Sequence, residues 1–181
     1  MPRLPEITAR EALPEDQRHV HDYLAKTRGA VRLPFSAVLT NPELAYRVAH
    51  VGSYVRFESS LPERVRELAI LTAAREFDVR FEWAGHARLA GEVGISREAI
   101  DLIANRQDPA ALAEEDAFPV RFAQALLRQH RLSDEFFAEA QSRLGDSGVI
   151  ELMTTVGYYA MLGCLLNGLA IEPGPDAPQL P

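Results

Sequence analysis

The chain has 181 residues, of which 47% are hydrophobic and 25% are charged. This length suits one domain with its own core, and the balance of apolar and charged residues is that of a folded globular protein. The formal net charge of -7 excludes the strongly basic nucleic-acid-binding class and disfavours anionic membrane surfaces, because both partners would be repelled.

The single cysteine, Cys164, excludes an intrachain disulfide and a cluster of thiolates within one chain. It falls in an apolar segment, so we expect it to be a small core residue.

The first ten residues, MPRLPEITAR, contain no apolar stretch of signal-peptide length. No uninterrupted apolar run reaches the roughly 18 residues of a membrane span. We therefore expect a cytoplasmic protein without a membrane partner.

Helix signals recur along the whole chain, and no segment shows a convincing period-two alternation of a strand. The first predicted helix, residues 14–26, is weak. Asn41 followed by Pro42 is typical of the start of a helix and predicts one over residues 42–54.

The next helix is expected to begin with a capping box, in which Ser60 is the cap and Glu63 bonds back to the amide of Ser60. The helix should end near residues 77–78. Its apolar residues recur on one face, which predicts a single buried stripe. The residues of that stripe are Val65, Leu68, Ala69, Leu71 and Thr72.

Further helices are predicted in the second half of the chain. They cover residues 79–94, a short stretch capped by Ser96, residues 116–129, residues 133–144 and residues 147–169, with a loop over 107–115 and a break at Gly145. We therefore expect a single all-helical domain over residues 1–181, with residues 1–40 as an N-terminal extension and residues 172–181 as an extended tail.

A short internal echo accompanies this pattern. The residues Val-Arg-Glu-Leu at 65–68 and Val-Ile-Glu-Leu at 149–152 each open a long helical stretch. The echo is consistent with a duplicated helical unit that carries chemistry in one copy only.

Residues 63–94 contain the residue types that acid–base chemistry needs. Glu82 and His86 are four residues apart on a predicted helix, so their side chains lie on one face. Glu67 lies on the preceding helix, and a helical hairpin would return it to His86. A carboxylate beside an imidazole raises its pKa and fixes its tautomer, which makes a general acid or base near neutral pH. The same spacing also occurs in exposed pairs worth only a few tenths of a kcal/mol.

The sequence resembles a known family at these positions. Arg-Glu-Leu at 66–68, an apolar helix, Phe-Glu-Trp at 81–83 and then His86 resemble the signature of the carboxymuconolactone decarboxylase and alkylhydroperoxidase D superfamily. The predicted helix over 147–169 resembles that group's last helix. The resemblance covers residues 42–171. It implies an all-helical fold, assembly as a homo-oligomer (trimer or hexamer), and a site near the Glu/His motif.

The peroxidase branch of this superfamily carries a Cys-x-x-Cys pair just before the histidine. Aligned on Glu67 and His86, those two positions hold Val79 and Glu82 in this chain. Peroxide reduction by a dithiol needs a thiolate and a resolving thiol, so we expect that activity to be absent. The lactone decarboxylases keep a glutamate four residues before the histidine, as in this chain.

The resemblance implies a cofactor-independent lyase that acts on a small carboxylated lactone or a related carbonyl compound. Loss of carbon dioxide leaves electrons that delocalise into the lactone carbonyl, so the protein must supply an oxyanion donor and an acid that protonates carbon. We assign proton transfer to His86, oriented and charged by Glu67 or Glu82. The residues assigned to substrate binding are Phe81, Trp83 and Arg88, with Arg80 and Arg75 as alternatives to Arg88.

Three alternatives remain open from the sequence. The first is another small-molecule reaction with the same residues, such as an isomerisation or a lactone opening. The second is a non-catalytic oligomeric binding protein in which Glu67 and His86 form a structural pair. The third is a divalent metal held by Glu67, Glu82 and His86, for which no full metalloenzyme motif is present.

The remaining histidines and two tyrosines receive a structural interpretation. We expect four histidines to face solvent: His19, His21, His50 and His130. We expect Tyr158 and Tyr159 to lie in the core or at a subunit interface.

Overall fold

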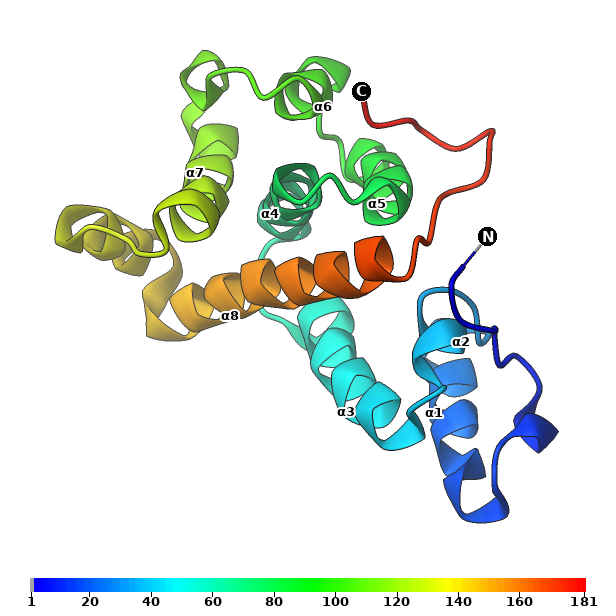
Figure 1. The fold of residues 1–181 in the computed structure, drawn as a ribbon. Helices are drawn as coiled ribbons and strands as arrows, with labels where there is room; N and C mark the ends of the chain where they lie inside the picture. The colour runs from blue at the N-terminus through cyan, green and yellow to red at the C-terminus, as the bar shows by residue number, and fades with distance from the viewer. Residues whose placement is uncertain (1) are drawn as a thin grey trace. The chain divides into compact units, whose positions relative to one another are not determined.

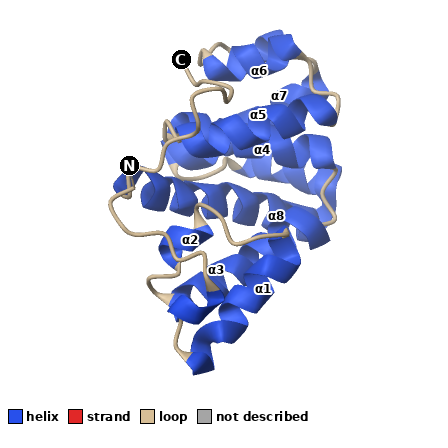
Figure 2. Cartoon of the chain, turned by 90° about the vertical axis from the view of Figure 1, so that its right-hand side faces the viewer, coloured by secondary structure: helices blue, strands red, loops and turns tan. Residues whose placement is uncertain are grey.

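The computed structural model describes residues 2–181 and confirms the all-helical prediction: those residues form eight α-helices and no strand (Figure 1, Figure 2). The chain divides into two compact units. The first comprises residues 1–59 with residues 166–172, and the second comprises residues 60–165 with residues 173–181. The single-domain organisation expected from the sequence stays a prediction.

The first unit contains the predicted N-terminal helices and one short helix, α2, that the sequence analysis missed. The start of α3 is as predicted, because the side chain of Asn41 accepts a hydrogen bond from the amide of Leu44 at 3.2 Å and Pro42 occupies the first turn. The elements are two 3-10 turns (Arg10–Ala12, Glu15–Gln17), α1 (Arg18–Arg28), α2 (Phe35–Val38), α3 (Pro42–Ser53) and a π-helical turn (Tyr54–Glu58).

The second unit contains the remaining predicted helices. Ser96 caps α6 as expected, by accepting from the amide of Ala99 at 3.1 Å. The break expected at Gly145 is a kink inside α8, where φ is 68° and ψ is 173°, a conformation that glycine adopts without strain. The elements are α4 (Glu63–Glu76), α5 (Arg80–Glu92), α6 (Arg97–Ala104), a 3-10 turn (Pro109–Ala111), α7 (Glu114–Gln124), a π-helical turn (Ala125–Gln129) and α8 (Asp134–Gly168).

Helix α4 is the interior helix of the second unit, and the prediction of a single buried stripe was too narrow. Every residue from Arg66 to Ala74 is buried. The reason is that α4 packs against α5 on one side and against α7 on another. A helix covered in this way carries apolar residues on all faces. Its buried charged residues, Arg66 and Glu67, therefore need partners inside the fold.

The predicted capping box at the start of α4 was wrong. The helix begins at Glu63, whose carboxylate lies 3.5 Å from Arg66 rather than at Ser60. Both the amide and the hydroxyl of Ser60 instead donate to Oε2 of Glu151, at 2.9 and 3.0 Å. Glu151 is a buried carboxylate on α8, so it takes the donors that a local cap would have used. This contact ties α8 to the start of α4.

A salt bridge and an apolar cluster join α4 to α7. The guanidinium of Arg64 donates to both oxygens of the buried Asp116 at 2.6 Å and to the carbonyl of Gly94 at 2.9 Å. Beside this bidentate pair lies an apolar cluster that α8 completes. The cluster consists of Leu61, Ala69, Phe118, Phe122, Ala123, Ala140, Val149, Leu152 and Val156.

Helix α8 is long and apolar enough to span a membrane, judged by length and composition alone. However, 56% of its most apolar 18-residue window is buried inside the structure, and Gly145 interrupts its helical backbone. The core helix of a soluble protein has the same properties. We interpret α8 as such a core helix.

Gly163 brings α8 very close to the connection between α4 and α5. A Cβ atom at this position would lie 2.9 Å from Cγ2 of Val79 and 3.2 Å from Cβ of Phe77. Valine is stiff about χ1, so it cannot move aside at little cost. Close packing at Gly163 therefore holds α8 against the segment that leads into α5.

We expect Gly163→Ala to lower the free energy of unfolding by about 1–3 kcal/mol, because the added methyl overpacks the contact with Val79. Gly157→Ala is the matched control on the same helix, where an added Cβ meets nothing within 4 Å. It should be neutral or stabilising by up to about 1 kcal/mol, since alanine is the better helix former. Urea unfolding of both variants measures the difference. Equal stabilities would contradict the close packing at position 163.

Candidate functional site

The candidate site is built on the hairpin of α4 and α5. Only residues 77–79 connect the two helices, and they lie side by side (Figure 1). Asp78 turns the chain with a left-handed backbone, at a φ of 51°. The hairpin returns α5 along α4, as the sequence analysis expected, and brings Glu67 to the same place as Glu82 and His86.

The imidazole of His86 lies between two carboxylates. Its Nδ1 is 2.6 Å from Oε2 of Glu67, and its Nε2 is 3.5 Å from Oε2 of Glu82. All three residues are buried, with exposed fractions of 4% for His86, 6% for Glu67 and 8% for Glu82. We call Glu67, Glu82 and His86 the buried trio. The structure thus brings together all three residues that the sequence analysis assigned to catalysis.

The two contacts of His86 differ in strength. The 2.6 Å contact with Glu67 is a short, charge-assisted hydrogen bond in which Nδ1–H donates. The 3.5 Å contact with Glu82 is at the outer limit of a hydrogen bond. Glu67 therefore holds Nδ1 more tightly than Glu82 holds Nε2.

The charges around His86 favour its protonated form. Burial alone lowers the pKa of the imidazole, but the hydrogen bonds and negative charges of Glu67 and Glu82 outweigh burial and raise the pKa above its ordinary value. The two carboxylates thus stabilise the protonated form of His86 against the opposing effect of burial. An imidazole held in this way can exchange a proton as an acid or a base.

Tyr159 is a contact of the site that the sequence analysis did not assign to it. Its ring meets the imidazole of His86 edge-on, with ring centroids 5.0 Å apart and planes at 87°. Tyr159 and its neighbour Tyr158 are both buried, as predicted for core residues. The sequence shows two adjacent tyrosines on an apolar helix, but it contains no signal for which of them faces α5.

The predicted substrate-binding residues only partly come together. Trp83 and Arg88 line one pocket of about 760 Å³, while Phe81 does not. No member of the buried trio lines this pocket either. Arg88 is exposed and pairs with Glu92 on its own helix.

The two alternative arginines have other roles. Arg75 donates to the carbonyl of Ala104 at 2.6 Å and pairs with Asp78, so it joins α4 to α6. Arg80 is exposed at the start of α5. Neither of them lines the pocket beside Trp83.

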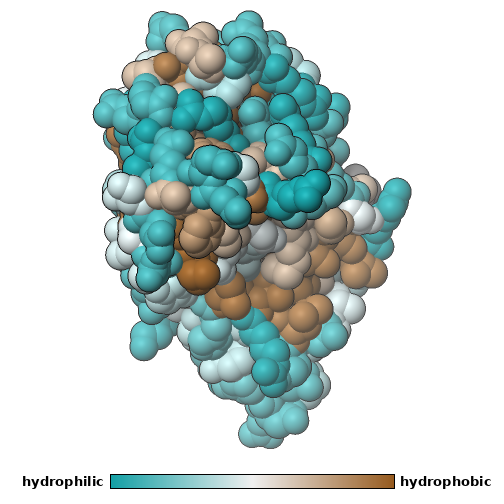
Figure 3. Space-filling view, turned by 90° about the vertical axis from the view of Figure 1, so that its left-hand side faces the viewer, coloured by the Kyte–Doolittle hydropathy of each residue, from teal (hydrophilic) through white to brown (hydrophobic). Residues whose placement is uncertain are grey.

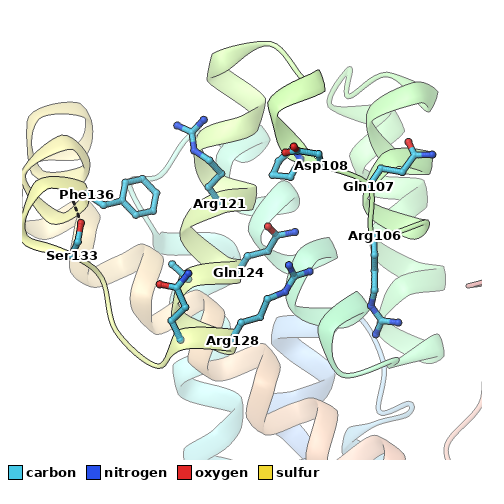
Figure 4. Close-up of a pocket in the computed structure, with 11 residues that line it drawn as sticks. Arg106, Gln107, Asp108, Arg121, Gln124, Arg128, Ser133 and Phe136 are labelled. Atoms are coloured by element: carbon cyan, nitrogen blue, oxygen red, sulfur yellow. Dashed lines mark hydrogen bonds between the residues drawn. The ribbon is translucent and has the colours of Figure 1, made fainter.

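A second pocket, of about 680 Å³, lies among the end of α6, α7 and the start of α8 (Figure 4). Its lining includes Arg106, Arg121 and Arg128, and each of these already pairs with a carboxylate. No residue of the buried trio lines it. We therefore place the candidate site at the buried trio rather than in this pocket.

Two expectations about single residues were wrong. Cys164 is exposed, because it is two residues from both Leu162 and Leu166, which are buried on the opposite face of α8. The side chain of His21 is only 16% exposed, and its Nε2 lies 3.0 Å from the carbonyl of Thr8. The other three histidines are exposed, as predicted: His19, His50 and His130.

The described part of the chain, residues 2–181, contains no group of three His, Cys, Asp or Glu side chains arranged to hold a metal ion. Within the buried trio, each ring nitrogen of His86 instead faces a carboxylate. The arrangement is that of a hydrogen-bonded proton relay.

The fold and the site define a class of protein: an all-helical, alkylhydroperoxidase D-like fold with a buried Glu–His–Glu trio. Residues 42–124 match the model of the carboxymuconolactone decarboxylase family. The matched segment resembles that family, and the fold is alkylhydroperoxidase D-like.

Two solved structures share the fold over nearly the whole chain. One is described as an alkylhydroperoxidase AhpD core, an uncharacterized peroxidase-related protein from Ralstonia eutropha JMP134. Its sequence is 14% identical to this chain, the TM-score is 0.78, and the alignment covers 97% of this chain and 93% of that one. The other is an uncharacterized peroxidase-related protein from Silicibacter sp. TM1040, 14% identical, with a TM-score of 0.74 and coverage of 97% and 96%. No curated protein matches the sequence. At these identities the likeness establishes the fold.

The raised pKa of His86 predicts a pH-dependent stability. The folded protein binds the imidazole proton more tightly than the unfolded chain does, so the stabilisation is complete below the ordinary pKa of about 6.5. It is lost as the pH rises through the raised pKa of the folded state. Urea unfolding between about pH 6 and about pH 9 should therefore show a falling free energy of unfolding.

Two variants test the origin of this fall. Glu67→Gln removes the stronger partner of His86 and lowers the pKa of the folded state, so the fall should be smaller and end at lower pH. His130→Gln changes an exposed histidine and should leave the profile of the wild type unchanged. A wild-type profile that is flat over this range would show that His86 is not held as an imidazolium.

Proposed function

We propose that the protein is a cofactor-independent lyase that decarboxylates a small carboxylated lactone or a related carbonyl compound, with His86 as its general acid. The observation that supports this proposal most directly is the buried position of His86 between the carboxylates of Glu67 and Glu82. The family match over residues 42–124 supports the same reaction class.

The proposed reaction needs one proton donor and no electron carrier. The bond between the ring carbon and the carboxylate breaks, and its electron pair delocalises through the ring alkene into the lactone carbonyl as carbon dioxide leaves. Nε2–H of His86 then protonates carbon, which discharges the dienolate. Glu67 holds the opposite side of the ring through Nδ1 and keeps the imidazole oriented during the transfer. Solvent returns the proton to Nε2 before the next turnover.

The environment of Nε2 favours this assignment over a purely structural pair. A structural ion pair would be expected to satisfy both ring nitrogens equally well, whereas the contact of Nε2 with Glu82 is long at 3.5 Å. Glu82 nevertheless supplies a negative charge that raises the pKa of the imidazole. Glu82 can thus favour reprotonation of His86 without forming a short hydrogen bond to the proton on Nε2.

Dithiol peroxidase chemistry is not part of this proposal. The chain has one cysteine, Cys164 on α8, and neither position that carries the cysteine pair in the peroxidase branch holds a cysteine. Those positions hold the buried Val79 and the carboxylate Glu82. The peroxidase-related description of the two solved structures therefore stays with those proteins.

We further propose a homo-oligomeric, cytoplasmic protein, with three or six copies of the chain. Large apolar side chains reach the surface, where the space-filling view shows them as brown areas on one face (Figure 3). Exposed apolar groups of this kind are typical of surfaces that another subunit covers. They are Leu4, Leu44, Val51, Tyr54 and Phe57 in the first unit and Phe137, Ile150 and Met161 in the second.

The reaction is tested with 4-carboxymuconolactone and a measurement of carbon dioxide release. The wild type should release carbon dioxide, and His86→Ala should reduce kcat by about 10²–10⁴-fold, the usual contribution of a general acid. Glu67→Gln should cause a smaller loss and shift the pH profile of kcat to lower pH. Circular dichroism of each variant serves as the folding control.

Two results would overturn the proposal. Turnover that persists in a folded His86→Ala variant would show that His86 is not the general acid. A wild-type protein that releases no carbon dioxide from this or from related lactones, yet is stabilised by one of them, would favour the non-catalytic binding protein instead.

A further inference from the structure

A mostly apolar pocket lies on the surface of α5 that adjoins the buried trio. It has a volume of about 760 Å³ and is formed by α5, α6 and residues 176–181 of the C-terminal segment. Its polar side chains, Arg88, Arg97, Asp101, Asn105, Asp176 and Gln179, carry two positive and two negative charges. Its apolar lining includes Trp83, Ala87, Ile95, Ile100 and Ala104.

The C-terminal segment supplies a wall of this pocket that no helix provides. Residues 173–181 belong to the same compact unit as α5 and α6, and the chain ends beside α6 (Figure 1). Leu180 is buried, with 8% exposed, although the residues on either side of it are exposed. A single buried leucine in an extended, mostly polar segment indicates that the segment is anchored to the fold beside the pocket.

Two arginines at the pocket form ion pairs that an anionic ligand can replace. Arg88 pairs with Glu92, and Arg97 donates to both oxygens of Asp101, in each case four residues along the same helix. The side chains of Arg88 and Arg97 are 64% and 82% exposed. Pairs of this kind contribute only about 0.3–0.5 kcal/mol, so an anionic ligand can compete for either guanidinium.

The pocket is distinct from the buried trio. Trp83 is three residues before His86 and therefore adjacent to it on the helix surface, yet the indole lines the pocket and the imidazole does not. The indole is 2% exposed and forms part of the boundary between the two. A ligand in the pocket would thus rest on the residue that neighbours the relay without touching the relay itself.

We propose that this pocket is a second small-molecule site, which binds a flat aromatic molecule carrying one anionic group. The aromatic rings lie against the indole of Trp83 and the isoleucines, and the anionic group pairs with Arg97. The C-terminal segment forms one side of the site, and Leu180 anchors that segment to the fold. The site does not depend on the reaction proposed for His86.

Trp83 makes this proposal directly measurable, because it is the only tryptophan of the chain. The probe is 1-anilinonaphthalene-8-sulfonate, an aromatic anion that fluoresces in apolar sites and accepts excitation energy from tryptophan. We expect one probe per chain to quench Trp83 and to emit on excitation of the indole. The neutral analogue N-phenyl-1-naphthylamine has the same rings without the sulfonate, and it should bind at least about tenfold more weakly.

Gly91→Leu and Gly85→Leu form a matched pair that locates the site. Both glycines lie on α5, are exposed, and have no atom within 4 Å of an added Cβ, but only Gly91 lines the pocket. Gly91→Leu places four carbons at the pocket and should weaken probe binding by at least about tenfold, while Gly85→Leu should not. Arg97→Gln should weaken binding of the anionic probe and leave the affinity for the neutral probe unchanged.

Each result decides one part of the proposal. Equal probe affinities for the two glycine variants, both shown to fold by thermal unfolding, would overturn the site. Equal affinities of the anionic and neutral probes, or an Arg97→Gln variant that binds both as the wild type does, would overturn the ligand class. His86→Ala should bind the probe like the wild type, so a failure of this site is distinguishable from a failure of the lyase reaction.

Discussion

The hydrogen bond between Glu67 and His86 is the interaction on which the organisation of the second unit depends. Glu67 lies on a helix that is buried on every side between residues 66 and 74, so its carboxylate has no access to solvent. A buried carboxylate without a partner would cost several kcal/mol. Helix α5, which returns through a three-residue connection, brings the imidazole of His86 to within 2.6 Å of this carboxylate. The charge at the centre of α4 therefore constrains the geometry of the hairpin, and the hairpin in turn creates the site.

The two carboxylates of the site are not equivalent, and their difference is the basis of the proposed chemistry. Glu67 holds Nδ1 closely and fixes the ring, while Glu82 stands 3.5 Å from Nε2 and contributes mainly charge. In the peroxidase branch of the superfamily, a cysteine occupies the position of Glu82. A carboxylate there replaces a redox-active thiol by a group that can only accept a proton or a hydrogen bond. This difference is the reason that the proposed function uses proton transfer and no dithiol.

The internal echo of the sequence acquires a physical meaning in the fold. Glu67 and Glu151 occupy matching positions of the two short motifs, and both are buried carboxylates. Glu67 accepts a hydrogen bond from the imidazole of His86, whereas Glu151 accepts from the amide and the hydroxyl of Ser60, just before α4. Neutral donors satisfy the second carboxylate without creating an acid. One copy of the motif is therefore suited to chemistry, and the other stabilises the packing of α4 and α8.

The sequence by itself determined the helical segments, the proximity of Glu82 to His86 and the lack of a dithiol, because capping residues, helical periodicity and cysteine count are local properties. The short helix α2 escaped prediction because four residues are too few for a periodic signal. Only the tertiary structure decided that Ser60 bonds Glu151, that Tyr159 meets His86, that Cys164 faces outward, and that the C-terminal segment lies over α5 and α6. Each of these depends on which helix covers which face of its neighbour. That choice minimises buried, unpaired polar groups over the whole unit, and no local pattern contains it.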